Sequence, residues 1–174
     1  MSSPIFRGVL AVALMWLGLT AACAMPRYEY RGRPAQTENR IQLLAGGPHL
    51  GVSATQHLSI AYEYSQTDRD LSISAVVDLD QALKTGFNTL ERLDIDLNFL
   101  DAEGAILATH RVYRSGFRRW ILTAELSFEQ RVTLPPGADF LLFSYAGRVL
   151  DTGSSDPQGA GSAVDWEFWE TPLP

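Results

Sequence analysis

Cysteine is almost absent from this chain, which excludes a disulfide framework and thiol chemistry in the folded part. Cys23 is the single cysteine, and it lies before any segment with the pattern of a folded element. A disulfide within the chain needs two cysteines, so the fold must rest on packing and hydrogen bonds. A nucleophilic thiol in the folded domain is excluded for the same reason.

The spacings that mark metal sites and activated nucleophiles are also missing. His49, His57 and His110 do not stand at the His-x-x-x-His or His-Glu-x-x-His spacings of zinc sites. No Gly-x-Ser-x-Gly turn is present, and no Gly-Lys-Ser or Gly-Lys-Thr follows the glycines at 46 and 47. We therefore assign no catalytic residue, no metal ligand and no cofactor.

Positive charge is scarce. The chain has 14 basic and 20 acidic residues, a formal net charge of −6, and Lys84 is its single lysine. An acidic chain is repelled by phosphate backbones and by anionic lipid surfaces, so we expect no nucleic-acid partner.

The first residues have the pattern of a bacterial export signal. A short start with one positive charge, Arg7, precedes the uncharged apolar run Gly8–Leu19, and small residues then lead to Cys23. This segment, which ends in Thr20-Ala21-Ala22-Cys23, resembles the lipobox of bacterial lipoproteins. The resemblance implies cleavage after residue 22 and a lipid on Cys23.

Two other interpretations of this segment compete with lipidation. Cleavage at the A-x-A pattern of residues 22–24 would remove Cys23 and release a soluble periplasmic protein. An uncleaved membrane helix is disfavoured, because the apolar run of residues 8–22 is shorter than the ~20 residues that span a bilayer. Within the lipoprotein resemblance, Ala24 implies sorting to the outer membrane, with the protein facing the periplasm. We therefore expect attachment to the membrane through the lipid on Cys23.

The sequence divides into three parts. Residues 1–22 are the expected signal peptide, and residues 23–37 are the expected lipidated N-terminus and flexible tether, because arginines and prolines leave them little apolar surface. Residues 38–174 are long enough for one domain with its own core.

Apolar and polar residues alternate with a period of two along most of this domain, the pattern of half-buried antiparallel strands. The strand-like segments are Ile41–Leu44, His57–Tyr64, Leu71–Val77, Leu93–Phe99, Ala105–Tyr113, Arg119–Phe128, Arg131–Leu134, Phe140–Val149 and Val164–Trp169. About eight or nine short strands predict an all-β fold, an antiparallel β-sandwich that is Ig-like or open-barrel-like. Asp80–Gly86 is expected to form one helical turn, with the aspartate as its N-cap.

One hairpin is predicted in detail. Asp101-Ala102-Glu103-Gly104 has the aspartate and glycine of a tight turn, so Leu93–Tyr113 should fold back on itself. This hairpin pattern loosely resembles the small Ig-like sandwiches of bacterial envelope proteins.

Three polar residues of this hairpin are spaced like calcium ligands. Asp94, Asp96 and Asn98 match the start of a calcium loop, but its glycine and final glutamate are missing. Strand alternation instead places them on one outward face, opposite Arg111 and Tyr113 of the partner strand. We interpret them as a solvated, cross-strand paired face rather than a cation site.

Aromatic and arginine side chains supply the candidate contacts. Trp166 and Phe168 should share a buried face of the last strand, so Trp169 should be exposed. An exposed tryptophan can stack on a sugar or anchor a partner protein, and Trp120 is a second candidate. The basic cluster of Arg114, Arg118 and Arg119 could bind an anionic group through bidentate hydrogen bonds.

Two hypotheses about function follow. The first is a lipid-anchored envelope protein whose β-sandwich binds or scaffolds another envelope component without catalysis. The alternative is a cell-envelope carbohydrate-binding module or glycan-directed enzyme that uses the exposed aromatics. A concave, aromatic-lined groove that holds two carboxylates would favour the alternative.

Overall fold

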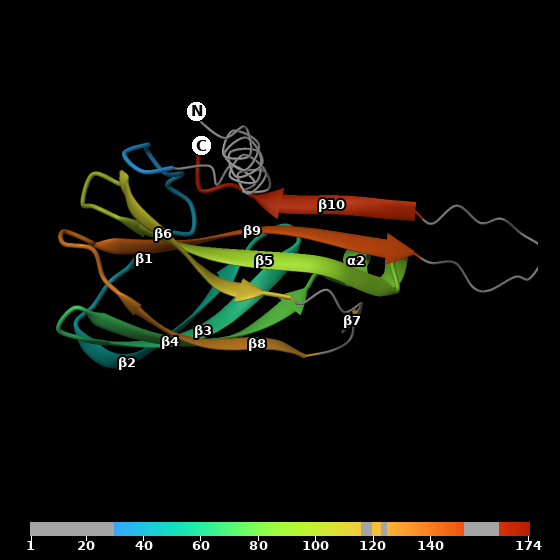
Figure 1. The fold of residues 1–174 in the computed structure, drawn as a ribbon, viewed down its shortest axis with the longest axis horizontal. Helices are drawn as coiled ribbons and strands as arrows, with labels where there is room; N and C mark the ends of the chain where they lie inside the picture. Colours follow the sequence, from blue (N-terminus) through green and yellow to red (C-terminus); the bar gives the residue numbers. More distant parts are fainter. Residues whose placement is uncertain (1–29, 116–119, 123–124, 152–163) are drawn as a thin grey trace, which may run out of the picture.

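The computed structural model describes residues 30–115, 120–122, 125–151 and 164–174, and these form a sandwich of two antiparallel sheets (Figure 1). The first sheet has the order β2-β3-β4-β8. Its strands are β2 (Gly46–Ala54), β3 (Leu58–Thr67), β4 (Asp70–Leu79) and β8 (Leu126–Thr133). The predicted all-β antiparallel sandwich is confirmed.

The second sheet has the order β1-β9-β5-β6, with β10 beside β9 and β7 beside β5. Its strands are β1 (Ile41–Gln42), β5 (Thr89–Leu100), β6 (Ile106–Arg114), β7 (Trp120–Ile121), β9 (Phe140–Asp151) and β10 (Val164–Glu170). Its longest strands, β5 and β9, lie side by side at its centre. Among the described residues, none forms a helix of the length and apolarity needed to cross a membrane.

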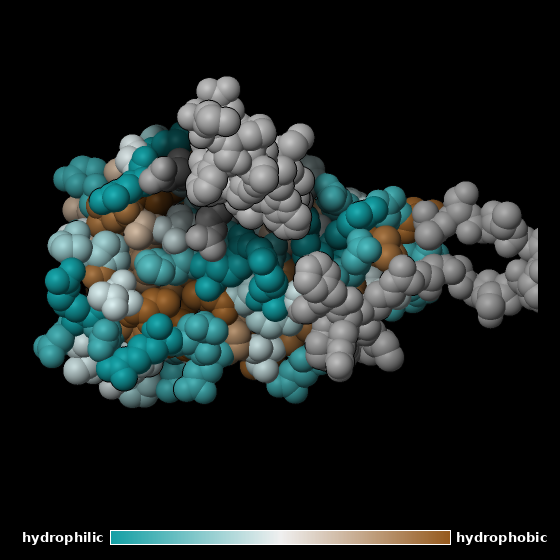
Figure 2. All heavy atoms as spheres, in the orientation of Figure 1, coloured by the Kyte–Doolittle hydropathy of each residue, from teal (hydrophilic) through white to brown (hydrophobic). Residues whose placement is uncertain are grey.

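The core lies between the sheets and follows the predicted alternation. Leu93, Ile95, Leu97 and Phe99 of β5 are fully buried, and they pack with the alternate residues of β3 and β4. Burying one such side chain contributes about 1.5–3 kcal/mol. The space-filling view shows apolar surface along one side of the molecule, flanked by polar residues (Figure 2).

The single helix among the described residues is α2 (Gln81–Gly86), which connects the two sheets. The Asp80 side chain accepts a hydrogen bond from the Ala82 amide at 2.8 Å, which satisfies an otherwise unpaired N–H of the first turn. The Phe87 amide donates to the Leu83 carbonyl at 3.1 Å and ends the helix. The predicted helical turn and its cap are confirmed.

The hairpin between β5 and β6 is also confirmed. Asp101 and Gly104 close the turn, with the Gly104 amide donating to the Asp101 carbonyl at 3.0 Å. The Ala105 amide donates to the Asp101 carboxylate at 2.7 Å. Gly104 has a φ of 86°, a conformation in which a Cβ is unfavourable, and here a Cβ would also overlap the Arg40 guanidinium.

Two strand predictions are corrected by the structure. The expected break between Phe128 and Arg131 does not exist, because β8 pairs with β4 without interruption from Leu126 to Thr133. Its polar central residues lie on an edge strand, where solvent can hydrate them. The single strand expected over Arg119–Phe128 is also wrong, because Trp120 and Ile121 pair with β5 of the other sheet. In addition, the sequence did not predict β2.

Residues 32–35, which were expected to be part of the flexible tether, pair with the folded domain. The Gly32 amide donates to the Ile106 carbonyl at 2.7 Å, and the Ala35 amide donates to the Gly104 carbonyl at 2.9 Å. The Ala35 side chain is buried in a small cluster that also contains Leu100, Ile106 and Leu142. Backbone pairing therefore holds residues 32–35 against the start of β6, although their composition is that of a linker. Cys23 lies outside the described residues.

Candidate binding surface

Of the predicted contact residues, the structure describes the side chains of Trp169 and Arg114, which lie at the two ends of one row across the six-stranded sheet. Trp169 is 60% exposed on β10, while Arg114 lies on β6 with its Nε 2.8 Å from a carboxylate oxygen of Asp94. Trp120 lies on β7, where its backbone pairs with Leu90. The Trp120 side chain, Arg118 and Arg119 lie outside what the structure describes.

Cross-strand ion pairs occupy the outward face of the hairpin, as predicted for Arg111, whereas Tyr113 is paired with Ile95 and packs against the core. Arg111 Nε and Nη2 donate to the two carboxylate oxygens of Asp96 at 2.8 and 3.1 Å, and Nη1 lies 3.4 Å from Asp94. The hydrogen bonds with Asp96 raise the pKa of the Arg111 guanidinium above its ordinary value, and the charges of both aspartates add to this. Both carboxylates are therefore engaged with arginine. Among the described residues, no group of three potential ligands could hold a metal ion.

Asn98 is a correction to the expected solvated face, because it is fully buried. Its amide group donates to the Leu142 carbonyl at 3.1 Å and to Ser144 Oγ at 2.9 Å. Its side-chain carbonyl accepts a hydrogen bond from Thr109 Oγ1 at 2.7 Å. Asn98 is a structural polar group that links β5 to both neighbouring strands.

Trp166 is a second correction. Phe168 is buried as expected, with its ring 5.7 Å from His57 and 6.1 Å from Tyr145, but Trp166 is 51% exposed. Trp166 pairs with Val149 near the end of the sheet. Its ring meets the ring of Phe87, the residue that directly follows α2, in an edge-on arrangement. Period two assigned its side correctly, but at this position little of the core covers that side.

Exposed aliphatic side chains gather on the outer face of the four-stranded sheet. Leu50 and Val52 of β2 are 76% and 66% exposed, and Val76 of β4 is 44% exposed. Val52 is paired with Ala61 of β3, and Ala61 is paired with Val76. Val52, Ala61 and Val76 therefore form a row across three strands. We call Leu50, Val52, Ala61 and Val76 the apolar strip.

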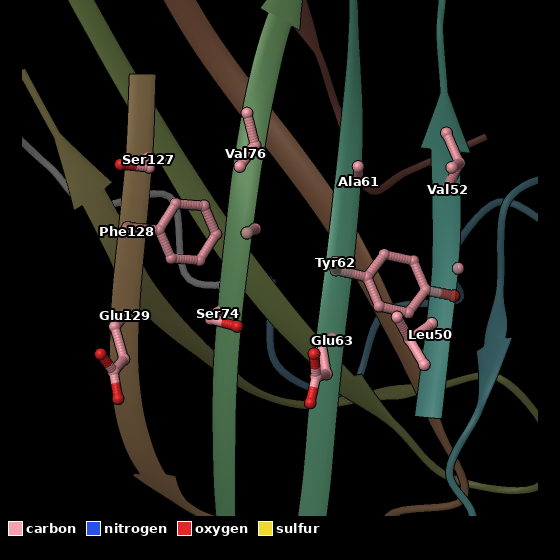
Figure 3. Close-up of a pocket in the computed structure, with 12 residues that line it drawn as sticks. Leu50, Val52, Ala61, Tyr62, Glu63, Ser74, Val76, Ser127, Phe128 and Glu129 are labelled. Atoms are coloured by element: carbon pink, nitrogen blue, oxygen red, sulfur yellow. The ribbon is translucent and has the colours of Figure 1, made fainter. Parts of the chain in front are cut away.

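The apolar strip borders an open depression of about 820 Å³ that crosses all four strands of this sheet (Figure 3). Small residues, Ser74 on β4 and Ser127 on β8, continue its floor away from β2. Glu63 and Glu129 lie in the same row as Leu50, on either side of Ser74. Within the described residues, neither glutamate takes part in an ion pair, unlike Asp70 and Asp78 of the same sheet.

The two glutamates do not make a convincing glycosidase pair. They lie on β3 and β8 with β4 between them, so their backbones are about 9.6 Å apart at the usual strand spacing. That is slightly more than the ~6.5–9.5 Å between the carboxyl groups of inverting enzymes. The aromatic rings nearest to them, Tyr62 and Phe128, face the core, where they lie 5.8 Å from Phe143 and 6.1 Å from Tyr113. The depression therefore lacks the aromatic platform on which a sugar stacks.

Core contacts hold β2 in place. The Tyr62 ring covers Gly51 so closely that a Cβ at Gly51 would overlap it. Burial raises the pKa of the Tyr62 hydroxyl, and the neighbouring Tyr64 raises it further. At the end of β2, Thr55 Oγ1 bonds with Tyr145 Oη of the opposite sheet at 2.7 Å. These contacts fix the position of β2, so the side chains on its exposed side project from a strand that the core holds in place.

Sequence reasoning missed this surface because its strand opens with two glycines and a proline. The signal that could have found it is the alternation of Leu50, Val52 and Ala54 with His49, Gly51 and Ser53. A second signal in the sequence is that none of the nine residues of this strand is Asp, Glu, Lys or Arg.

Comparison of the chain with models of protein families, with curated proteins and with solved structures finds no match.

Proposed function

We propose that this chain is a lipid-anchored protein of the bacterial envelope whose β-sandwich binds or scaffolds another envelope component without catalysis. The observation that carries the binding part is the apolar strip, whose Leu50 and Val52 are 76% and 66% exposed. Beside it lie two carboxylates that have no ion-pair partner in the part of the chain that the structure describes. A contiguous exposed apolar patch with a polar rim is typical of an interaction surface.

The anchoring part is supported by the resemblance of residues 20–23 to a lipobox. Each buried methylene of an acyl chain contributes about 0.8 kcal/mol, and one chain alone holds a protein only marginally. The several chains of a bacterial lipoprotein would make attachment permanent. Outer-membrane placement facing the periplasm follows from the same resemblance and belongs to the proposal.

Replacing the lipidated residue tests the anchor. We expect wild type to remain in the membrane fraction after a high-salt wash and Cys23→Ser to appear in the soluble periplasmic fraction. Intact-mass spectrometry should find acyl chains on a mature protein that starts at Cys23. A soluble wild-type protein whose first residue is Met25, without fatty acid, would contradict lipidation.

The scaffolding part is tested by isolating the lipidated wild-type protein from mildly solubilised envelopes, with Cys23→Ser as the unanchored control. One complex of fixed stoichiometry is the expected result. A glycan bound to the protein without any protein partner would contradict it.

Glycan binding is a second candidate, favoured by the position of Trp169. Its side chain is 60% exposed and stands next to Ala146, and the same row of the sheet continues to the Asp94–Arg114 ion pair. A small neighbour leaves one face of the indole open, and the ion pair offers hydrogen-bonding groups to hydroxyls.

Under this second candidate, Trp169→Ala should weaken binding to envelope glycans by at least about tenfold, measured by glycan array and calorimetry. Trp166→Ala is the matched control, because Trp166 is similarly exposed but belongs to the other face of β10. Equal loss in both variants, or no glycan binding by wild type, would remove this candidate.

A further inference from the structure

The backbone of β2 presents hydrogen-bonding groups at the open edge of the four-stranded sheet. At the turn into β3, the Thr55 amide donates to the Leu58 carbonyl at 3.0 Å, so Thr55 and Leu58 are a hydrogen-bonded pair. Hydrogen-bonded and non-hydrogen-bonded pairs alternate along an antiparallel ladder. The N–H and C=O groups of Leu50, Val52 and Ala54 therefore point away from β3, toward the edge.

These same residues direct their side chains to the outer face, where Leu50 and Val52 belong to the apolar strip. One strand thus offers free backbone groups and apolar side chains on alternate residues, which is what an added strand requires. Pro48, which has no N–H, limits this edge at its start. The useful length runs from Leu50 to Ala54.

The other edge of the sheet is protected in the usual way. β8 carries Glu129 and Arg131 on its outer face, and charges on an edge strand oppose pairing with another chain. β2 has no charged residue. Within the described residues, β2 has a neighbouring strand on one side only. The difference between the two edges marks β2 as the one suited to a partner.

Charge indicates the chemistry of that partner. Glu63 is directly paired with Leu50 and has no ion-pair partner among the described residues. A strand added beside β2 would lie about 9.6 Å from β3. A lysine or arginine opposite Leu50 can span this distance over the leucine and meet the glutamate. The net charge of −6 also favours a cationic segment.

We infer that β2 binds an extended segment of a partner protein, with an aliphatic residue opposite Val52 and a lysine or arginine opposite Leu50. This inference rests on the binding part of the proposed function and not on the lipid anchor. A second copy of the chain is the rival occupant. Pairing two β2 edges would leave Glu63 of each copy without a cation, so the charge pattern disfavours it.

The probe is the acetylated and amidated peptide Lys-Thr-Val-Thr-Lys-Thr-Val, whose lysines and valines share one face. We expect it to bind the full-length protein in detergent, measured by fluorescence anisotropy, and to slow hydrogen exchange at Leu50, Val52 and Ala54. The same peptide with N-methylated valines should lose binding at least about tenfold, because these amides face the edge. A peptide with glutamate in place of lysine should also bind weakly.

Two protein variants separate the backbone contribution from the charge contribution. Val52→Pro removes an N–H that faces the edge and none that bonds to β3, so we expect at least about a tenfold loss. Glu63→Gln should weaken the lysine peptide about threefold to tenfold. Glu129→Gln, two strands further from β2, is the matched control and should bind like wild type.

Several outcomes would overturn this inference. The inference fails if the peptide does not bind, or if it slows hydrogen exchange in another strand of the sheet. It also fails if Val52→Pro binds the peptide as well as wild type does, or if Glu63→Gln and Glu129→Gln change the affinity equally. Dimerisation of the protein alone in sedimentation equilibrium, with protection confined to β2, would assign the edge to a second copy. If the envelope complex forms equally well with Val52→Pro, the inference fails and the proposed function stands. If neither wild type nor Val52→Pro forms an envelope complex, the proposed function fails.

Discussion

Phe168→Ala is expected to lower the free energy of unfolding by about 3–5 kcal/mol, the usual cost of removing a buried aromatic ring. Phe168 is 1% exposed, and its ring lies over Gly147 of β9 and beside Tyr145 and His57. Removing the ring would open a cavity where β10 packs against the core. Urea denaturation followed by tryptophan fluorescence measures the change.

The same strand supplies the control. Trp169→Ala removes a larger ring from the exposed face of β10 and should change stability by only about 0.5 kcal/mol. Comparable losses in Phe168→Ala and Trp169→Ala would contradict the assignment of core and surface faces.

Gly147 makes the prediction about Phe168 sharper, because a Cβ at this position would overlap the ring. Gly147→Ala alone should therefore destabilise by about 1–3 kcal/mol through overpacking. Added to Phe168→Ala, it should cost much less, since the ring is gone. A double-mutant cycle measures this coupling, and strict additivity would show that the two residues are not in contact.

Asn98→Asp is expected to destabilise the domain by at least about 3 kcal/mol at pH 7, because it places a carboxylate at a fully buried position. The amide now donates to the Leu142 carbonyl and to Ser144. A carboxylate cannot donate to either, and it would stand near Asp96, although Arg111 offsets part of that repulsion.

The loss should depend on pH in a defined direction. Burial raises the pKa of the introduced carboxyl in the folded state, while in the unfolded state it stays near 3.9. Between the two values the folded state binds more protons, so stability relative to wild type falls as pH rises through this range. Below about pH 4 the difference should shrink to the loss of hydrogen bonds. Asn98→Leu, which has no titrating group, should show a deficit that does not change over the same range.

The alternation of residue types was sufficient to predict the strands that supply the core. Leu93, Ile95, Leu97 and Phe99 are buried as a set because the opposite sheet covers the whole central strand. The turn at residues 101–104 and the cap at Asp80 were also predictable, since each depends on local backbone geometry that few residue types satisfy.

The errors occur where burial depends on neighbours far away in sequence. Trp166 and Phe168 share one side of β10, yet only Phe168 lies over the core. Asn98 continues the side of Asp94 and Asp96, but β6 and β9 bury it between Thr109 and Ser144. Period two gives the side of a sheet and cannot tell whether something covers that side.

The candidate surface was not predictable for a related reason. Gly46, Gly47 and Pro48 are residue types depleted in strands, although a strand at the edge of a sheet tolerates a proline whose nitrogen faces solvent. The exposure of Leu50 and Val52 follows from the position of β2 at that edge. Strand order is set by contacts between distant segments, so no local pattern reports it.

The two ends of the described chain meet on the six-stranded sheet. The Gln36 amide donates to the Pro172 carbonyl at 2.9 Å, and its side chain bonds to Glu170 at 3.2 Å. In Figure 1 the C-terminus lies above this sheet, while β2 belongs to the layer below. An affinity tag or a fluorescent protein fused after Pro174 would therefore leave the domain beside residue 36, on the layer opposite β2. C-terminal fusions are the practical format for imaging and capture, because they leave the exposed strand free to engage its ligand.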